Sequence, residues 1–337
     1  MKKLIVITIL TLPILFFLQG CGHTDNITRL QGVAQGTYYN ILYCDQQHRD
    51  LKPQIDSILD EFDLSASLWI DSSLIRKINR GEDSILNSTL ERLLNMSIMM
   101  NTYTGGAFDC RVGSLVNAWG FGFKARQSLS EQEVDSLLHI CHAPIHIRQN
   151  SEGQPFLKKD DSRTEIDFNA IAQGYSVDLV GKYFESLNIS DYLIDIGGEV
   201  LAKGSKPNGS EWSVGIERPA PTKESTPEVI AAISLRDASV VTSGNYRKYY
   251  EKDGQRYSHT INPATGYPVQ HTLLSVSVVD QYAWRADALA TAFMVMGLDS
   301  SLAFIAQHPE HNSVYFIYDD NGTYKTYGTD SFNKLIR

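Results

Sequence analysis

Segments with the composition of β-strands and segments with helical periodicity alternate irregularly along this chain. Apolar residues recur at helical spacing in residues 51–62, 88–99, 170–187, 284–296 and 300–307. Runs rich in β-branched and aromatic residues predict strands at residues 36–43, 191–196, 212–216, 229–235, 239–242, 257–261, 274–279 and 314–318. Because no regular strand-then-helix order runs through the chain, we expect an α+β fold with mixed or antiparallel sheets and packed helices.

Length and charge exclude some classes of protein. A chain of 337 residues, of which 42% are apolar, can bury a large core in one big domain or two ordinary ones. The 39 acidic residues exceed the 30 basic ones, and no basic cluster follows the first few positions. Since binding to a phosphate backbone needs clustered Lys and Arg, we exclude nucleic acid as a partner.

The first 21 residues have the pattern of an export signal. Lys2 and Lys3 precede an apolar run at residues 4–18, and Leu18-Gln19-Gly20-Cys21 ends this run with small residues. Cleavage before the cysteine of Leu-x-Gly-Cys is the bacterial lipoprotein pattern, so we expect Cys21 to carry a lipid. An ordinary signal peptide or a short membrane anchor is the alternative, although the run is short for a bilayer span.

The signal also sets the expected organisation. We expect a signal peptide at residues 1–20, a polar tether at 21–30 and one folded domain at 31–337. The protein would be a bacterial membrane lipoprotein facing the periplasm or the cell exterior, held by its lipid alone, because no later segment is long and apolar enough to cross a bilayer. The remaining cysteines, Cys44, Cys110 and Cys141, have no C-x-x-C spacing and indicate core packing.

Asp287 and Thr291 stand four residues apart in an expected helix, so their side chains project from one face. A carboxylate and a hydroxyl could bind a hard cation such as Mg²⁺, which completes its coordination with water, phosphate and backbone carbonyls. Alternatively, Asp287 caps the start of the helix and Thr291 is a small packing residue. The spacing leaves both interpretations open.

His259 lies in the strand expected at residues 257–261, before a turn indicated by Pro263 and Gly266. A neutral imidazole at this place could accept a proton from a hydroxyl near physiological pH. A single histidine is also common as a structural or merely exposed side chain.

Two glycine-containing segments likewise have a functional and a structural interpretation. Gly197 and Gly198 could let backbone N–H groups approach a pyrophosphate, or they could form a plain hairpin turn. The rings of Trp119-Gly120-Phe121-Gly122-Phe123 could stack on a flat ligand or pack in a core. Because the chain has no Walker-type loop and no G-x-G-x-x-G, any nucleotide site would use another architecture.

Taken in order, the motifs of this chain resemble those of the FAD:protein FMN transferases, the ApbE-like flavin transferases. The motifs are Gly36-Thr37-Tyr38, Ser67-Leu68-Trp69, Gly106-Ala107-Phe108-Asp109, Trp119-Gly120-Phe121-Gly122, residues 167–175, Ile196-Gly197-Gly198-Glu199, Ser243-Gly244-Asn245-Tyr246, residues 259–269 and residues 286–291. Together they extend over essentially the whole chain after the tether.

The resemblance implies a fold and an activity. Members of that family are exported, commonly lipid-anchored, magnesium-dependent enzymes with a single α+β catalytic domain related to the T-fold. They split FAD at its pyrophosphate, attach the FMN half through a phosphoester to a Thr or Ser hydroxyl of a target protein, and release AMP.

The resemblance also implies site residues. The Mg²⁺ ligands would be the backbone carbonyl of Ala170 with Asp287 and Thr291, and His259 would be the general base. Asp109 or Asp287 could serve instead, but a metal ligand is a weaker base, which favours the histidine. The implied contacts with FAD come from Ser67, Leu68, Trp69, Asp109, Gln173, Gly197, Gly198 and Ile261.

Three residues depart from the family's motifs. Arg111 and Ser114 replace the threonine and the proline of Phe-Asp-x-Thr-x-Gly-Pro, and Gln173 stands where a lysine or glutamate commonly precedes Gly-Tyr. Arg111 could contact a phosphate or carboxylate, or could lie on the surface. Gln173 keeps the capacity for hydrogen bonds without a charge.

The resemblance implies an acceptor protein with an Asp-x-x-Thr/Ser-Gly-Ala-Thr/Ser-like site, such as a subunit of a sodium-pumping quinone reductase (Nqr), an Rnf-type complex or another exported redox protein. Two alternative functions share the motifs. An FAD pyrophosphatase would use water and release FMN and AMP. A flavin-binding lipoprotein without chemistry would not need Asp287 and Thr291. Trp69, where the family's transferases carry an aromatic residue, favours transfer.

Overall fold

The computed structural model describes residues 27–125, 127–219, 228–245, 249–252 and 255–337. The export signal, Cys21 and Tyr246 of one motif therefore lie outside the described residues. The first strand, β1, begins at Thr28. Residues 28–30, which we assigned to the tether, therefore belong to β1. Ile27 is the one other residue of the tether that the structure describes.

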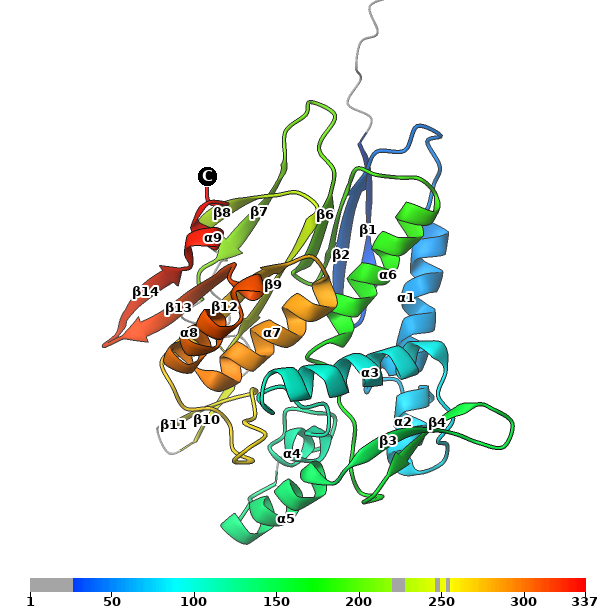
Figure 1. Cartoon of the computed structure of the whole chain (residues 1–337), viewed down its shortest axis with the longest axis vertical. Coiled ribbons are helices and arrows are strands. Elements are labelled where there is room, and N and C mark those ends of the chain that lie inside the picture. Colours follow the sequence, from blue (N-terminus) through cyan, green and yellow to red (C-terminus); the bar gives the residue numbers. More distant parts are fainter. Residues whose placement is uncertain (1–26, 126, 220–227, 246–248, 253–254) are drawn as a thin grey trace, which may run out of the picture.

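An eight-stranded sheet forms the centre of the described part of the chain (Figure 1). Its strands, in spatial order, are β1 (Thr28–Ala34), β2 (Thr37–Tyr43), β5 (Tyr192–Ile196), β6 (Glu199–Lys203), β9 (Ala238–Gly244), β12 (Leu273–Asp280), β13 (Val314–Asp320) and β14 (Thr323–Gly328). Every neighbouring pair is antiparallel. The α+β expectation is confirmed, in its antiparallel form.

Two-stranded hairpins complete the described β-structure. They are β3 (Ile145–Gln149) with β4 (Pro155–Lys159), β7 (Trp212–Glu217) with β8 (Val229–Leu235), and β10 (Tyr249–Lys252) with β11 (Gln255–Ser258). Trp212 and Ile233 of the β7–β8 hairpin are fully buried in a cluster with Val200 and Val240 of the central sheet. This hairpin therefore covers one face of the sheet.

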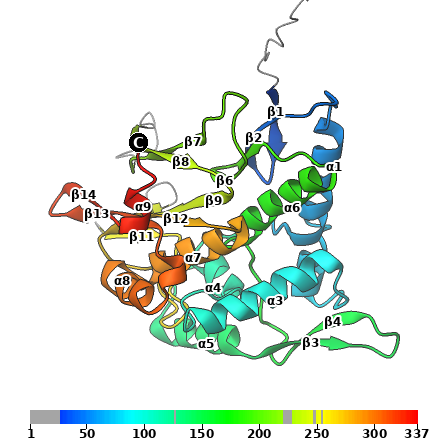
Figure 2. The same cartoon turned by 45° about the horizontal axis from the view of Figure 1, so that its top comes forward.

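Helices cover the opposite face, as Figure 2 shows for α6 and α7. The helices are α1 (Lys52–Ala66), α2 (Leu74–Arg80), α3 (Ser88–Tyr103), α4 (Gly113–Ala118), α5 (Glu131–His142), α6 (Ala172–Ser186), α7 (Ala283–Met296), α8 (Leu298–Gln307) and α9 (Asp330–Asn333). Because α7 packs against β9, β12 and α6, its side chains are buried almost all round, which explains its nearly unbroken apolar sequence.

The sequence located many, but not all, of the elements that bury an apolar face. The expected helices correspond to α1, α3, α6, α7 and α8, and the expected strands to β2, β5, β7, β8, β9, β11, β12 and β13. One boundary was wrong, because β11 ends at Ser258 and His259 lies in a bend after it. The strands β1, β3, β4, β6, β10 and β14 and the helices α2, α4, α5 and α9 were not expected.

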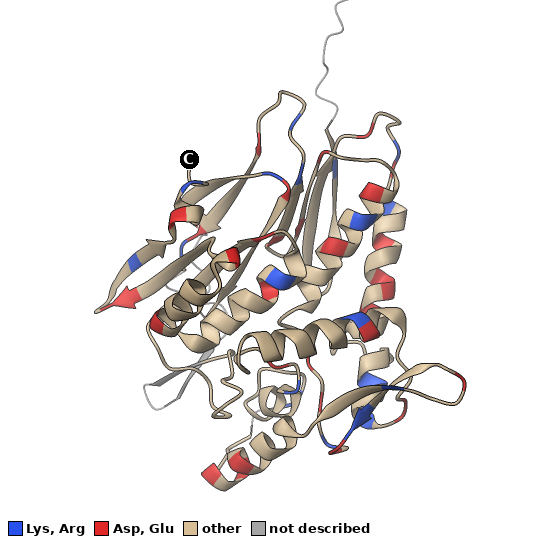
Figure 3. Ribbon diagram, viewed as in Figure 1, with Lys and Arg blue, Asp and Glu red and all other residues tan. Residues whose placement is uncertain are grey.

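Several other expectations concern the surface and the cysteines. Acidic and basic residues are intermingled over the elements drawn in Figure 3. Cys44, Cys110 and Cys141 are free thiols, and burial raises the pKa of Cys110 and of Cys141 to about 12. Within the described ranges, no helix has both the length and the apolar character that a bilayer span requires.

Candidate active site

A cavity of about 690 Å³ opens where the N-terminus of α6, the middle of α7 and the turns β1–β2 and β5–β6 come together. Segments far apart in the sequence therefore contribute to one site. The expected site residues that line the cavity are Trp69, Asp109, Ala170, Gln173, Gly197, Gly198, His259, Ile261, Asp287 and Thr291.

Asp287 is a buried carboxylate that contacts the start of α6. Asp287 is only 5% exposed, and its Oδ2 accepts a hydrogen bond of 3.1 Å from the N–H of Gly174. The interpretation of Asp287 as the cap of its own helix is wrong, because the N-cap of α7 is Tyr282. Asp287 instead satisfies one of the unpaired N–H groups at the start of α6.

The surroundings of Asp287 disfavour its ionised form when no cation is bound. Burial raises the pKa of Asp287 to about 7, against the opposite effect of the hydrogen bond from Gly174. Among the described residues, no Lys, Arg or His forms an ion pair with this carboxylate. A buried carboxylate without a basic partner is a candidate ligand for a cation.

The donors around Asp287 fit Mg²⁺ chemically. Thr291 follows one helical turn later and lines the same cavity, with its Oγ1 3.3 Å from the Oγ of Ser243. The N–H of Gly174 donates to Asp287 and not to the carbonyl of Ala170 four residues earlier, which leaves that carbonyl without its helical partner. A carboxylate, a hydroxyl and a carbonyl suit a hard cation that keeps water or phosphate ligands.

The donor set around Asp287 contains only one titratable side chain, unlike a metal site built from several His, Cys, Asp or Glu residues. Within the part of the chain that the structure describes, no three His, Cys, Asp or Glu side chains are grouped so that they could hold a metal ion. In the proposed ligand set, Asp287 is the one carboxylate, and Thr291 and the carbonyl of Ala170 are neutral. Such a site depends on the ligand for the rest of its negative charge.

Gly197 and Gly198 form the two-residue turn between β5 and β6, with φ angles of 63° and 108°. The N–H of Gly197 donates to the carbonyl of Tyr38, and the N–H of Gly198 donates to Asp195 Oδ1, each at 2.9 Å. The hairpin interpretation is therefore confirmed. Both N–H groups are already used, so their approach to a pyrophosphate is not supported.

Gln173 connects α6 to this hairpin. Its Nε2 donates to the carbonyl of Ile196 at 2.8 Å. A Cβ on Gly197 would overlap Nε2 of Gln173 and lie 2.6 Å from Cγ2 of Thr37. Gly197 is therefore needed both for its positive φ and for the close approach of Gln173.

Asp109 lines the cavity but is paired. The guanidinium of Arg111 donates from Nε to Oδ1 at 2.9 Å and from Nη2 to Oδ2 at 2.6 Å. Arg111 is thus neither a free phosphate ligand nor a surface residue, and Asp109 is a poor candidate for the general base. Ser114 points elsewhere, since its Oγ donates to the carbonyl of Arg163.

His259 is half-buried in the bend after β11 and is the histidine that lines the cavity. Its ring lies 6.4 Å from that of Phe121, edge to face. Trp119 of the same aromatic segment packs instead in a small cluster with Leu115 and Cys141, and its Nε1 donates to the carbonyl of Gly266. In this aromatic segment, Phe121 therefore lines the cavity, whereas Trp119 packs in the core.

Of the segment Ser67-Leu68-Trp69, Trp69 alone lines the cavity, and it is 64% exposed. The Oγ of Ser67 accepts a hydrogen bond from the N–H of Trp69, and its carbonyl accepts one from Ser73. Leu68 is buried in the main core. Ser67 thus contacts Trp69 and Leu68 packs in the core, and the contacts of these two residues with FAD stay predictions.

Gln35 and Asp167 are among the polar residues that line the cavity and that sequence reasoning did not assign to the site. Gln35 precedes Gly36 in the β1–β2 turn, and this glycine was the only local signal for it. Asp167 accepts a hydrogen bond of 2.7 Å from the N–H of Asn169, in a segment that was recognised for its resemblance alone.

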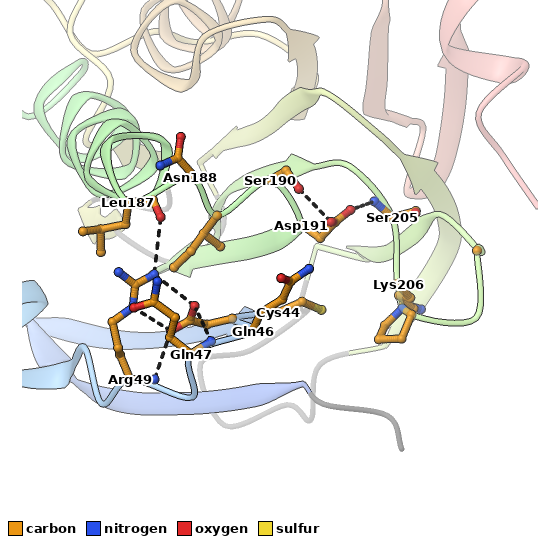
Figure 4. Close-up of a pocket in the computed structure, with 14 residues that line it drawn as sticks. Cys44, Gln46, Gln47, Arg49, Leu187, Asn188, Ser190, Asp191, Ser205 and Lys206 are labelled. Atoms are coloured by element: carbon orange, nitrogen blue, oxygen red, sulfur yellow. Dashed lines mark hydrogen bonds and ion pairs between the residues drawn. The ribbon is translucent and has the colours of Figure 1, made fainter. Parts of the chain in front are cut away.

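A second cavity, of about 760 Å³, lies at the opposite ends of β2, β5 and β6 (Figure 4). Its charged groups are used within the protein: Arg49 forms an ion pair of 2.8 Å with Asp45, and Asp191 accepts hydrogen bonds from Ser190 and Ser205. None of the expected site residues lines it. The first cavity is therefore the candidate active site.

The chain is similar to named proteins over nearly its whole length. It is 33% identical to an FAD:protein FMN transferase of Vibrio cholerae over 97% of this chain and 98% of that protein. It is 32% identical to one of Haemophilus influenzae over 99% of each chain. The solved structure of the flavin transferase ApbE from Vibrio cholerae matches with a TM-score of 0.79 and 32% identity, over 92% of this chain and 99% of that one.

The family comparison agrees with the geometry. The matched residues, 35–316, begin at the β1–β2 turn and end in β13, and they include every expected site residue that lines the cavity. The chain belongs to the ApbE family.

Proposed function

We propose that this protein transfers the FMN moiety of FAD to a Thr or Ser hydroxyl of an acceptor protein, forms a phosphoester-linked flavin and releases AMP. The named relatives are FAD:protein FMN transferases. The observation that carries the proposal for this chain is Asp287, a buried carboxylate without a basic partner among the described residues, in the cavity that Trp69 also lines.

Asp287, Thr291 and the carbonyl of Ala170 would hold Mg²⁺ in this cavity. A bound Mg²⁺ supplies positive charge that stabilises the diphosphate and the leaving phosphate. The protein itself supplies orientation. Trp69 offers an exposed ring for stacking on a planar part of FAD, and the paired side chains of Asp109 and Arg111 hold one wall of the cavity in place.

In the proposed reaction, the acceptor oxygen forms a bond to the phosphorus of the FMN half. The bond from that phosphorus to the bridging oxygen breaks, and AMP leaves with the electron pair. His259 accepts the hydroxyl proton, since it is the histidine in the cavity and Asp109 is occupied by Arg111. The alignment of hydroxyl and phosphorus supplies the rest of the catalysis.

The lipoprotein signal leads to a proposal about orientation. A lipid on Cys21 would hold the protein to a membrane that faces the periplasm or the cell exterior. β1 begins at Thr28, near that anchor, and its seven residues end at Ala34, before the turn that lines the cavity. Seven strand residues span about 23 Å. The acceptor would then be an exported redox subunit of Nqr or Rnf type on the same side of the membrane.

The proposed function is tested with purified protein, FAD, Mg²⁺ and an exported redox subunit that carries an Asp-x-x-Thr/Ser-Gly-Ala-Thr/Ser-like site. We expect a fluorescent, covalently flavinylated acceptor and one AMP for each FMN transferred. His259→Gln should lower the transfer rate about 100-fold or more while FAD binding persists. Free FMN formed at the full rate without acceptor would indicate a pyrophosphatase, and FAD recovered intact would indicate a binding protein.

A further inference from the structure

The helices α6 and α7 cap each other's N-termini. They lie side by side beneath the central sheet (Figure 1). In the described chain, neither Ile171 of α6 nor Tyr282 of α7, the two N-cap residues, caps its own helix with a side chain. Because the first N–H groups of a helix need acceptors, each of these helices depends on its neighbour for them.

Asp178 of α6 is the acceptor for α7. Its Oδ1 accepts a hydrogen bond of 3.0 Å from the N–H of Ala283, and its Oδ2 accepts one of 2.9 Å from the N–H of Trp284. Asp178 is only 6% exposed. Since each oxygen accepts one N–H, the carboxylate fixes the first turn of α7 in both position and orientation, and its charge suits the positive end of that helix.

Asp287 of α7 is the acceptor for α6, so the contact is reciprocal. Gly174 donates to Asp287, and Ala283 donates to Asp178. Each carboxylate stands four residues after the donor on its own helix. The two carboxylates differ in their access to the site, because among the described residues Asp287 lines the cavity and Asp178 does not. Asp178 therefore acts on the site only through α7.

The same two helices carry the ligands proposed for Mg²⁺. Ala170, with its carbonyl, directly precedes the first turn of α6, whereas Asp287 and Thr291 lie on α7. One cation can bind all three groups only if the two helices keep their spacing, and Mg²⁺ tolerates little deviation from octahedral geometry. The bonds from Asp178 fix α7 to α6 one helical turn before Asp287.

We propose that Asp178 is a positioning residue for the cation site: its carboxylate holds the first turn of α7 against α6 and so places Asp287 and Thr291 near the carbonyl of Ala170. The inference rests on the proposed function for the cation itself. Because Asp178 acts through the backbone of α7, its loss should weaken the binding of the cation more than the binding of FAD.

The test measures Mn²⁺ binding by electron paramagnetic resonance, with FAD present and no acceptor protein. Mn²⁺ takes the same oxygen ligands as Mg²⁺, and its signal does not depend on turnover. Asp178→Asn replaces one accepting oxygen with an NH₂ group that faces an N–H donor. The Kd for Mn²⁺ should rise about 10-fold or more, as for other groups that orient metal ligands without touching the metal. Transfer should fall at limiting Mg²⁺ and return to within about twofold of wild type at saturating Mg²⁺.

Ala283→Pro tests the same contact from the side of α7. Proline lacks the N–H that donates to Asp178, and it is favoured at the first position of a helix. The backbone of Tyr282 is extended, with φ of −117° and ψ of 131°, which suits the residue before a proline. Ala283→Pro should therefore keep the helix and weaken Mn²⁺ binding as Asp178→Asn does.

Asp45→Asn is the matched control for a general loss of stability. Asp45 is 5% exposed and accepts hydrogen bonds from the N–H groups of Gln47 and Arg49, but it lies at the second cavity. The Tm of this variant should fall while its Kd for Mn²⁺ stays at the wild-type value. An equal loss of Mn²⁺ binding in Asp45→Asn would overturn the proposal, because a loosened fold would then explain the effect.

A fourth variant separates this inference from the proposed function. Asp287→Asn should lose Mn²⁺ binding, since it removes the charged ligand itself. If Asp287→Asn keeps the wild-type affinity, the cation site fails and the positioning role fails with it. If Asp287→Asn loses Mn²⁺ while Asp178→Asn and Ala283→Pro bind it as wild type does, the cation site stands and the role of Asp178 is refuted.

Discussion

Replacing Gly174 with alanine should displace the start of α6 from α7 and so disturb Asp287. A Cβ on Gly174 would overlap the carbonyl oxygen of Ala283 and lie 2.9 Å from the Cβ of Asp287. A backbone carbonyl in a packed helix cannot turn aside, so the helices must separate by about 0.5 to 1 Å. Because the N–H of Gly174 donates to Asp287 at 3.1 Å, this shift would break or badly weaken the hydrogen bond.

The expected loss can be estimated from these contacts. Overpacking costs about 1 to 3 kcal/mol, and a lost hydrogen bond to a carboxylate costs about 1.5 to 3 kcal/mol. The better helix propensity of alanine returns up to about 1 kcal/mol. We therefore expect the free energy of unfolding to fall by about 1.5 to 6 kcal/mol, and a displacement near 1 Å to slow transfer about 100-fold.

Gly181→Ala is the matched control, because Gly181 lies two turns further along α6. A Cβ there would lie 2.7 Å from Cδ2 of Leu201 and 3.2 Å from Oη of Tyr192, which are movable side-chain ends. Thermal unfolding and FMN transfer across a series of Mg²⁺ concentrations would compare the two variants. Gly181→Ala should keep the transfer rate. A Gly174→Ala protein with the wild-type rate and Mg²⁺ requirement would refute the role of this contact in placing Asp287.

Three further predictions concern the two cavities. Because burial raises the pKa of Asp287 to about 7, ionisation of Asp287 without Mg²⁺ should cost the folded protein up to about 4 kcal/mol as the pH rises from about 4 to 7. At pH 8 with a chelator present, Asp287→Asn should therefore unfold at a higher temperature than wild type. Mg²⁺ should raise the Tm of wild type but not that of the variant. A variant less stable than wild type under chelation would contradict this. Trp69→Ala should raise KM for FAD about tenfold through lost stacking, without a change in Tm, since Trp69 is 64% exposed; an unchanged KM would exclude stacking at this ring. Arg49→Met should leave Asp45 buried without its cation and lower the free energy of unfolding. Its kcat and KM for FAD should match wild type, and a loss of transfer would connect the second cavity to the reaction.

Helical periodicity and strand composition predicted those elements whose burial leaves a pattern. The sequence of α6 shows Val177, Val180 and Phe184 on one side, and all three are fully buried. β1 was missed because it is an edge strand: Arg29, Gln31 and Val33 face outward and are exposed, so no apolar run marks it. β6 was missed because it is short and directly follows two glycines, whose turn could be recognised while the return strand could not.

The candidate site shows the same limit at the level of single residues. Asp109 and Asp287 are both carboxylates of recognisable motifs, both line one cavity, and both are nearly buried, at 9% and 5% exposure. From the sequence, either carboxylate could serve as the general base in place of His259. In the fold, Asp109 is neutralised by a guanidinium two residues away, whereas Asp287 receives one peptide N–H from a helix more than 100 residues earlier in the chain. Asp109 forms an ion pair within the protein, whereas the described protein groups supply no cation to Asp287, so a bound cation would have to do so. Residue type therefore predicts which chemistry is available, and the tertiary partner decides which of two like residues performs it.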